Sequence, residues 1–322
     1  MIKFIILTFI GFYLLIKGSD LFVDGISSFA HNIKVPKLIV SLTVVAFGTS
    51  TPELFISFKS LLNGNNDIVM ANVVGSTIVN TMLVIGVAAM VKSMKIKSET
   101  VKKQLPLHLL LITIFAILFL DGPFNGTENA ISRSDALIMF LLFGYFVYYT
   151  YKYAKEQQSK NIFKLFLEKE KPKWNLSKSI FYSLLGLAFI AIGSELAVTN
   201  CVNIAEAMHV SQKIITMVIL VVGTSTPELI MAVTAVKKDE FDIIIGNIVG
   251  TNIFNIGFVL TLPVLIFGGF STPSFNSYDM IIMIIAGLLI YIFAKDDKKI
   301  DKTEGLIMIT IFIIYYAYLI LV

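Results

Sequence analysis

Long apolar stretches follow one another along the chain, separated by short segments that contain charges, glycine and proline. Their hydrophobic residues are continuous rather than alternating with polar ones, which predicts helices and excludes a β-barrel. Ten stretches approach the ~20 residues that a helix needs to cross a bilayer. We place them at approximately 2–17, 37–62, 67–91, 105–120, 135–153, 179–198, 213–236, 242–267, 279–294 and 305–321. The pattern predicts an all-α integral membrane protein with ten transmembrane helices.

Composition and the distribution of positive charge fit a protein of the cell membrane. Hydrophobic residues make up 56% of the 322 residues, and the mean hydropathy is +0.83. With both termini outside, 22 of the 26 lysines and arginines fall in cytoplasmic segments, as the positive-inside rule requires. The net charge of +4 is explained by these loops and an anionic inner leaflet, so it does not indicate a nucleic acid partner. We expect a multi-pass protein in the lipid bilayer that functions as a monomer.

An internal repeat relates the two halves of the chain. The segment Gly48–Leu54, with the sequence GTSTPEL, returns unchanged as Gly223–Leu229. The same offset of 175 residues pairs Gly18 with Gly193, which we place at the ends of the first and sixth spans. The first apolar stretch is therefore interpreted as part of a repeat rather than as a cleaved signal peptide.

The repeat also predicts the domain organisation. One transmembrane domain contains a first five-helix repeat at 1–154 and a second at 179–322, joined by a short basic cytoplasmic linker at 155–178. The repeated motif regions are 46–86 and 221–261. Because five is odd, the two copies would cross the membrane in opposite orientations. Inverted repeats of this kind are typical of secondary transporters, whose sites lie at the midplane where the halves meet.

Each motif combines a proline that disturbs the helix with groups that carry oxygen. Pro52 lacks the N–H that would bond to the carbonyl of Gly48, and Pro227 has the same effect in the second copy. Adjacent threonines and serines add hydroxyls, while Glu53 and Glu228 add carboxylates. An ionisable group at mid-span costs a few kcal/mol and needs a partner. No lysine or arginine adjoins either glutamate, so a bound cation is the expected partner.

Polar side chains also recur in the span that follows each motif. Asn72, Ser76 and Asn80 are spaced four apart and therefore share one face of a helix. Their partners in the second half are Asn247, Thr251 and Asn255. These residues either contribute to a cation site or hold neighbouring helices together by hydrogen bonds, and for Asn72 and Asn247 the two interpretations are evenly balanced.

The type of donor limits the ion. Carboxylates, hydroxyls, amides and carbonyls suit Ca²⁺ and Na⁺, whereas Mg²⁺ sheds its water reluctantly and transition metals favour His and Cys. His31, His108 and His209 lie near predicted span ends without ligand spacing, and we interpret them as structural or surface residues. Cys201, the single cysteine, allows no intrachain disulfide and is interpreted as a packing residue. No prosthetic cofactor is expected.

The paired Gly-Thr-Ser-x-Pro-Glu motifs, each followed by a helix with Asn-x-x-Gly-Ser/Thr-x-x-x-Asn, resemble the α-repeats of the cation/Ca²⁺ exchanger superfamily. The similarity covers nearly the whole chain and is greatest to the prokaryotic sodium/calcium exchangers. It implies a ten-helix inverted-repeat antiporter that admits Na⁺ and drives Ca²⁺ out. Spans one and six would slide across the ligand-bearing core to alternate access.

The resemblance also implies a ligand set. Glu53 and Glu228 would bind both ions in competition, assisted by the carbonyls of Thr49 and Thr224. Asn80 and Asn255 would face the centre. Flanking Na⁺ sites would use the hydroxyls of Ser50, Ser76, Ser225 and Thr251 and the carbonyls of Ala46 and Val221.

This chain departs from the family pattern at the centre of the implied site. Some members have an aspartate where this chain has Asn255, so only two carboxylates remain. Two carboxylates balance one Ca²⁺ but not three Na⁺, which leaves stoichiometry and voltage dependence open. Thr251 replaces a more usual serine.

Other functions are also compatible with two buried glutamates. A Ca²⁺/H⁺ antiporter would couple through protonation of Glu53 and Glu228, and a K⁺-dependent exchanger is a further alternative. A membrane enzyme could use the glutamates as an acid and base, but the chain has no activated nucleophile, His-Glu metal motif or soluble catalytic domain. A passive channel is disfavoured because a site with many ligands binds too tightly for fast conduction.

Overall fold

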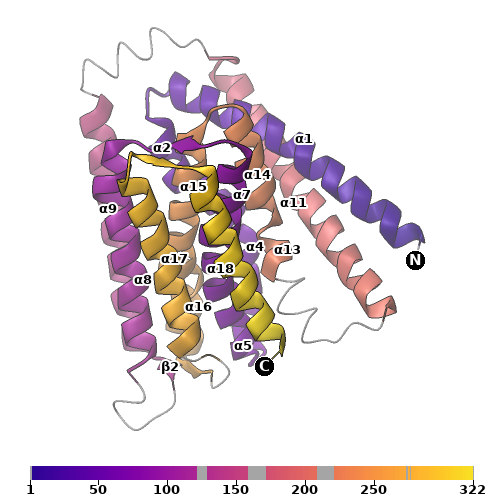
Figure 1. The fold of residues 1–322 in the computed structure, drawn as a ribbon, viewed down its shortest axis with the longest axis vertical. Coiled ribbons are helices and arrows are strands. Elements are labelled where there is room, and N and C mark those ends of the chain that lie inside the picture. The colour runs from indigo at the N-terminus through magenta and orange to yellow at the C-terminus, as the bar shows by residue number, and fades with distance from the viewer. Residues whose placement is uncertain are drawn as a thin grey trace. The chain divides into compact units, whose positions relative to one another are not determined.

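The computed structural model describes residues 2–121, 129–158, 172–208, 221–272, 275 and 277–321, which are almost entirely helical (Figure 1). The chain forms two compact units. Unit 1 contains Met1–Thr49 and Val147–Ile248, and unit 2 contains Ser50–Phe146 and Val249–Val322. Each unit therefore combines segments from both halves of the sequence.

Eight helical stretches in the described ranges are long and apolar enough to cross a membrane, which confirms the prediction of a helical integral membrane protein. They are Ile2–Asn32, Asn66–Val91, Thr100–Phe119, Arg133–Glu156, Leu176–Ala197, Phe241–Phe267, Ser277–Lys295 and Lys302–Leu319. Of the other two expected spans, 37–62 is interrupted within its length. Residues 213–220 of the seventh span and 159–171 of the linker lie outside the described residues. The number ten stays a prediction.

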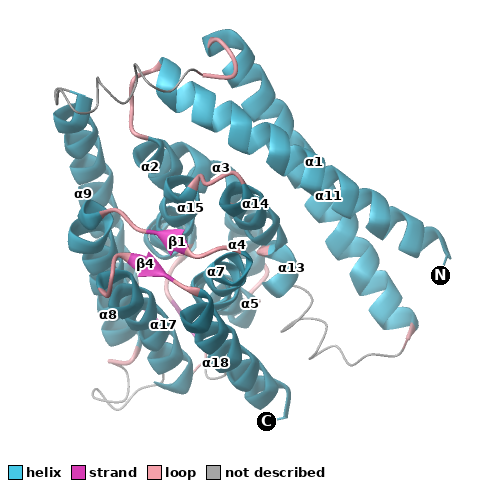
Figure 2. Cartoon of the chain, turned by 45° about the horizontal axis from the view of Figure 1, so that its top comes forward, coloured by secondary structure: helices cyan, strands magenta, loops and turns pink. Residues whose placement is uncertain are grey.

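Unit 1 is built around two long helices, α1 (Ile2–Asn32) and α11 (Leu176–Ala207), which run side by side (Figures 1 and 2). A Cβ added at Gly11 would lie 2.7 Å from the carbonyl oxygen of Gly193, and one at Gly18 would lie 2.8 Å from that of Gly186. Gly11 precedes Gly18 along α1, whereas its partner Gly193 follows Gly186 along α11, so the two helices are antiparallel. Close approach at small residues is a common basis for helix association in lipid.

The prediction that Gly18 and Gly193 end their spans is wrong, because both glycines lie inside α1 and α11. The polar residues beside Gly18 had suggested a helix end at the membrane surface. Ser19 is instead fully buried. These glycines allow the two backbones to approach each other and do not terminate the helices.

Short helices complete unit 1, and two longer helices continue from one unit into the other. The short elements are α2 (Lys37–Val40), the π-helix η1 (Ser41–Val45), α3 (Ala46–Thr49), α13 (Val221–Thr224) and α14 (Thr226–Lys237). The continuing helices are α9 (Arg133–Gln158) and α15 (Phe241–Phe254).

In unit 2, α8 packs on α17 while α7 packs on α18. Its helices are α4 (Thr51–Leu62), α5 (Asn66–Met70), η2 (Ala71–Gly75), α6 (Ser76–Ile78), η3 (Val79–Val84), α7 (Ile85–Val91), η4 (Thr100–Gln104), α8 (Leu105–Phe119), η7 (Asn255–Val259), α16 (Thr261–Phe267), α17 (Ser277–Lys295) and α18 (Lys302–Leu321). Asn66–Val91 and Phe241–Phe267 are far more buried than the other candidate spans. Such burial is expected for the segments that carry the polar faces.

Two short antiparallel strand pairs join loops of unit 2. Strand β1 (Met94–Lys95) pairs with β4 (Lys299–Ile300), as Figure 2 shows. Strand β2 (Ala130–Ile131) pairs with β3 (Phe270–Ser271). Paired loops must lie on the same side of a membrane, so each strand pair connects helix ends at one face of the unit.

Candidate functional site

Both copies of the motif interrupt a helix at the same serine. In the first copy α3 ends at Thr49 and α4 begins at Thr51, and in the second α13 ends at Thr224 and α14 begins at Thr226. Helical bonding resumes at once, since the carbonyls of Ser50 and Ser225 accept hydrogen bonds from the residues four positions later, both at 3.1 Å. The expected disturbance is therefore present, two residues before each proline.

In unit 2 Glu53 lies on α4 and is almost completely buried, with 1% of its surface exposed. Its backbone carbonyl accepts a hydrogen bond from Asn72 Nδ2 at 3.0 Å, and the same nitrogen lies 3.0 Å from Ser57 Oγ. Asn72 therefore connects η2 to α4, which favours the helix-packing interpretation for this residue. The hydroxyl of Ser76 donates to the carbonyl of Asn72.

Two buried amides in unit 2 keep their nitrogens bonded and their oxygens unbonded. Asn80 Nδ2 donates to Asn252 Oδ1 at 3.4 Å, and Asn255 Nδ2 donates to Ser76 Oγ at 3.2 Å. Among the described residues, neither Asn80 Oδ1 nor Asn255 Oδ1 has a hydrogen-bond partner. Both amides lie in π-helical turns, η3 and η7, a conformation that is frequent at functional sites. Their oxygens are available to a cation.

Further oxygen groups of the expected set lie in unit 2. The hydroxyl oxygen of Ser50 is buried and makes no hydrogen bond within the described ranges, and Thr251 is also fully buried. Ser50 is itself the residue at which the helix is interrupted. Unit 2 thus contains Glu53, Ser50, Ser76, Asn80, Thr251 and Asn255.

Unit 1 contains the corresponding groups of the second motif and part of the first. Glu228 is 1% exposed, and neither carboxylate oxygen makes a regular hydrogen bond to a described residue. The Thr49 hydroxyl interacts with this carboxylate and approaches Asn247 Oδ1 and the Ala46 carbonyl, both at 3.4 Å. Ser225 is buried, and its hydroxyl likewise has no hydrogen-bond partner in the described chain. The carbonyls of Val221 and Thr224 belong to α13, immediately before the interruption.

The donor chemistry of these groups is that of a site for a hard cation. Each unit provides one buried carboxylate with hydroxyl oxygens, and unit 2 adds two unbonded amide oxygens. In the part of the chain that the structure describes, no group of three or more His, Cys, Asp and Glu side chains could hold a metal ion. Ca²⁺ and Na⁺ accept neutral oxygen ligands readily, whereas transition metals select nitrogen and sulfur.

Three buried side chains beside the candidate ligands, Asn252, Thr81 and His108, had not been connected with them from the sequence. Asn252 contacts Asn80, Thr81 and His108 in a buried polar cluster. His108, expected to be structural or at the surface, is fully buried on α8. Polar residues inside apolar helices were the only sequence signal for this cluster. His108 is distant in sequence from both motifs, so nothing in the sequence connected it with them. His209 lies outside the described residues, and nothing is described of the Cys201 side chain.

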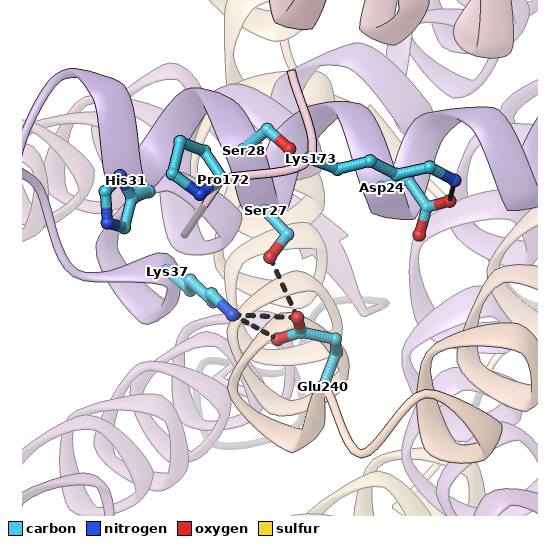
Figure 3. Close-up of a pocket in the computed structure, with 8 residues that line it drawn as sticks. All are labelled: Asp24, Ser27, Ser28, His31, Lys37, Pro172, Lys173 and Glu240. Carbon is cyan, nitrogen blue, oxygen red and sulfur yellow. Dashed lines mark hydrogen bonds and ion pairs between the residues drawn. The ribbon is translucent and has the colours of Figure 1, made fainter. Parts of the chain in front are cut away.

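A second charged cluster lies in unit 1, around a cavity of about 260 Å³ (Figure 3). Lys37 Nζ lies 2.7 Å from Glu240 Oε1, which also accepts a hydrogen bond from Ser27. Lys173 and Lys238 contact Asp24 at 2.7 and 2.8 Å. The acidic groups of this cluster are paired with lysines, so it is an ion-pair network rather than a cation site.

Comparisons with known proteins identify the family of the chain. Residues 3–152 and 178–321 match the family model described as sodium/calcium exchanger protein. The chain belongs to the sodium/calcium exchanger family. It is 33% identical to the putative antiporter CaxA of Alkalimonas amylolytica over 96% of both chains. It is 28% identical to the sodium/calcium exchanger MaX1 of Methanosarcina acetivorans, over 99% of this chain and 98% of that protein.

A solved member of the exchanger family has the same fold. This structure is the sodium-calcium exchanger NCX_Mj soaked with 10 mM Na⁺ and 10 mM Sr²⁺, with a TM-score of 0.84 and 29% identity over 98% of both chains. Family membership and the apolar spans together make this chain a multi-pass membrane transport protein of the cell membrane. Its relatives are named as exchangers and antiporters, so the family is one of transporters rather than enzymes.

Proposed function

We propose that this protein is a secondary active antiporter that exchanges Na⁺ for Ca²⁺ across the cell membrane, with Glu53 and Glu228 as the ligands that both ions share. One observation carries the proposal: each copy of the motif places a glutamate with only 1% of its surface exposed inside an apolar helix. A buried carboxylate needs a compensating positive charge. A transported cation supplies it.

The proposed ligands follow the duplicated motif. The carbonyls of Thr49 and Thr224 assist the two glutamates, and Asn80 and Asn255 present amide oxygens to the centre. The flanking Na⁺ sites use Ser50, Ser76, Ser225, Thr251, Ala46 and Val221. Support comes from the unbonded oxygens of Ser50, Ser225, Asn80 and Asn255 within the described chain.

Competition for the glutamates makes the exchange obligatory. A site that holds Ca²⁺ has no carboxylate left for its full complement of Na⁺, so the two cargoes cannot be carried together. Each change of access then moves one type of ion, through movement of α1 and α11. The monomer contains the complete machinery.

We further propose ten transmembrane helices in two inverted repeats, 1–154 and 179–322, with both termini outside. The glycine contacts of unit 1 support this symmetry. Adding 175 to Gly11 gives Gly186, and subtracting 175 from Gly193 gives Gly18. The contact between Gly11 and Gly193 is thus the symmetry mate of the contact between Gly18 and Gly186. Such an exchange of partners is expected across a two-fold axis.

Loop contacts within each unit support the alternation of sides. In the ten-helix arrangement, β1 and β4 are both cytoplasmic, while β2 and β3 are both outside, and each pair is observed. In unit 1 the Figure 3 cavity is lined by Lys173 of the linker and by Glu240, just before α15, and both belong to segments assigned to the cytoplasm. If the number of membrane crossings between two paired loops were wrong by one, the two loops would lie on opposite sides of the membrane and could not pair.

The coupling ion is tested by flux in reconstituted liposomes. Uptake of ⁴⁵Ca²⁺ is measured with an outward Na⁺ gradient, then with an outward H⁺ gradient at matched buffering, with and without K⁺. We expect uptake with Na⁺ that does not require K⁺. Uptake driven by H⁺ alone would refute the assignment and favour a Ca²⁺/H⁺ antiporter.

The shared-ligand mechanism is tested in the same liposomes with Glu53→Gln and Glu228→Gln. Each change keeps the size of the side chain but removes its charge, so we expect loss of Na⁺-driven Ca²⁺ uptake from protein that still folds. Size-exclusion chromatography verifies the fold. Full activity of both variants would rule out this mechanism.

A further inference from the structure

Four side chains in unit 2 form a continuous polar chain that ends at a proposed ligand. His108 on α8, Asn252 on α15, and Thr81 and Asn80 in η3 are all buried, with at most 1% of their surfaces exposed. Asn252 Nδ2 lies 3.1 Å from His108 Nε2 and 2.8 Å from Thr81 Oγ1. Asn252 Oδ1 accepts the 3.4 Å hydrogen bond from Asn80 Nδ2.

Hydrogen-bond polarity fixes the direction of this chain. In the structure Asn252 Nδ2 faces His108 Nε2, and an amide NH₂ group can only donate. In the matching tautomer Nε2 accepts and the ring proton is on Nδ1, which has no hydrogen-bond partner among the described residues. The two hydrogens of Asn252 are then used by His108 and Thr81, and its oxygen faces Asn80. Asn80 must offer its nitrogen to that oxygen, which leaves Asn80 Oδ1 without a hydrogen-bond partner in the described chain.

We propose that His108 is a positioning residue of the cation site, whose Nε2 lone pair fixes the Asn252 amide and thereby keeps the oxygen of Asn80, rather than its nitrogen, available to the transported cation. The inference rests on the proposed function, because it takes Asn80 as a ligand. His108 does not contact the ion and acts through two amide side chains.

The need for such a device follows from the symmetry of an amide side chain. The oxygen and nitrogen of asparagine are nearly equal in size, so packing alone does not distinguish two orientations that differ by a half-turn. The reversed orientation of Asn80 would direct an NH₂ group toward a cation. An acceptor at the end of the chain favours the orientation in which Asn252 Nδ2 donates to it, and so the orientation of Asn80 that leaves its oxygen unbonded.

The test compares two substitutions of His108 in liposomes. His108→Leu removes the acceptor, and His108→Gln restores one, since Gln Oε1 can occupy nearly the same position as Nε2. We expect His108→Leu to raise the KM for Ca²⁺ about 10-fold with little change in the maximal rate, as is typical when the partner of a metal ligand is lost. His108→Gln should remain within about threefold of the unmodified protein.

Thr113→Val is the matched control on the same helix. It removes a hydroxyl that bonds to the carbonyl of Leu109 in α8, outside the polar chain. Its KM for Ca²⁺ should equal that of the unmodified protein. A purely structural role of His108 would instead lower the amount of folded protein or the maximal rate, and His108→Gln would be no better than His108→Leu.

A double variant tests the route through Asn80. In the Asn80→Ala background, His108→Leu should cause no further rise in KM, because the ligand that it positions is already absent. A full additional rise, an unchanged KM in His108→Leu alone, or no rescue by His108→Gln would each overturn the proposal. Absence of Ca²⁺ uptake by the unmodified protein would overturn the proposed function itself. Uptake that is abolished by Glu53→Gln but insensitive to His108→Leu would overturn the positioning role alone.

Discussion

The charge of the proposed cation site depends on single residues, and Asn255 is the clearest example. This amide is fully buried in η7 and its oxygen has no hydrogen-bond partner among the described residues. An oxygen at this position can contribute to a cation site without adding formal charge. The two glutamates then provide all of the negative charge, which matches Ca²⁺ better than a set of Na⁺ ions.

Asn255→Asp should therefore change how flux depends on membrane potential. A third carboxylate alters the net charge of the loaded site, and one elementary charge crossing 100 mV changes the free energy by about 2.3 kcal/mol. We expect a different ratio of Na⁺-driven Ca²⁺ uptake between liposomes at zero potential and liposomes at about −100 mV. Asn65→Asp makes the same chemical change at an exposed turn and should leave the ratio unaltered. The same ratio in Asn255→Asp would show that this position does not set the charge balance.

At this scale the sequence identified side chains by type, but it could not predict their hydrogen bonds. The motif indicated Glu53 and Glu228 because buried acids are rare in apolar helices. It did not reveal that Asn72 connects two helices, or that Asn80 is oriented through Asn252. These contacts depend on which helices become neighbours, and His108 is brought to the cluster from a separate span.

The helices α1 and α11 pack so closely at their glycines that added bulk should disturb them. A Cβ at Gly18 would meet Gly186 O and Ile190 N at 2.8 Å, closer than atoms can approach without movement of the backbone. Gly18→Ala should lower the thermal midpoint of the detergent-solubilised protein, and Gly18→Val should lower it further, in proportion to ~1–3 kcal/mol of overpacking. Gly144→Ala is the control, since a Cβ there meets nothing within 4 Å. Equal midpoints for Gly18→Ala and Gly144→Ala would disprove the close contact.

The ion pair between Lys37 on α2 and Glu240, just before α15, is a second link that can be tested. The atoms lie 2.7 Å apart, and the two side chains are only 15% and 18% exposed, so solvent screens the pair weakly. Lys37→Glu should lower the thermal midpoint by placing like charges together, and adding Glu240→Lys should restore most of the loss. The exposed pair of Lys299 and Asp297, 3.6 Å apart, is the control, and Lys299→Glu should have little effect. Failure of the double reversal to restore stability would count against a direct interaction.

Helix boundaries were predictable where charged residues mark the membrane surface, as at 67–91 and 279–294. They were wrong where polar residues are buried between helices, as in α1 beyond Gly18. The interruptions at Ser50 and Ser225 were foreseen from the prolines, but the π-turns at Asn80 and Asn255 were not. Such turns are rare and occur mostly as single turns inside α-helices, so the helical pattern of the sequence does not distinguish them.

At the scale of the molecule, the ten-helix topology makes a prediction about sidedness. In a background where Cys201 is replaced by serine, single cysteines replace Lys95, Lys299, Ser132 or Ser271. The ten-helix arrangement places the first two in the cytoplasm and the last two outside, so an impermeant maleimide should label them from those sides. The pairing of β1 with β4 and of β2 with β3 requires the two members of each pair to share a side. Retained Ca²⁺ uptake verifies each variant. Labelling of Lys95→Cys and Lys299→Cys from opposite sides would contradict the topology.

The class of molecule was evident from hydropathy and from the duplicated motif, since both are properties of the linear chain. The composition of the two units was not, because each unit combines segments from both sequence halves. Each paired strand has only two residues, and its position depends on where the helices end. No local β-pattern in the sequence therefore predicts these strands.

The glycine contacts between α1 and α11 have a genetic consequence. Every missense change in a glycine codon adds at least a Cβ, and at Gly11, Gly18, Gly25, Gly186 and Gly193 that atom would lie 2.6–2.8 Å from an atom of the opposite helix. No amino acid is therefore a conservative replacement along this line. In a saturation mutagenesis library selected for function, these codons should be among the most depleted of variants, although none of them encodes a proposed ion ligand.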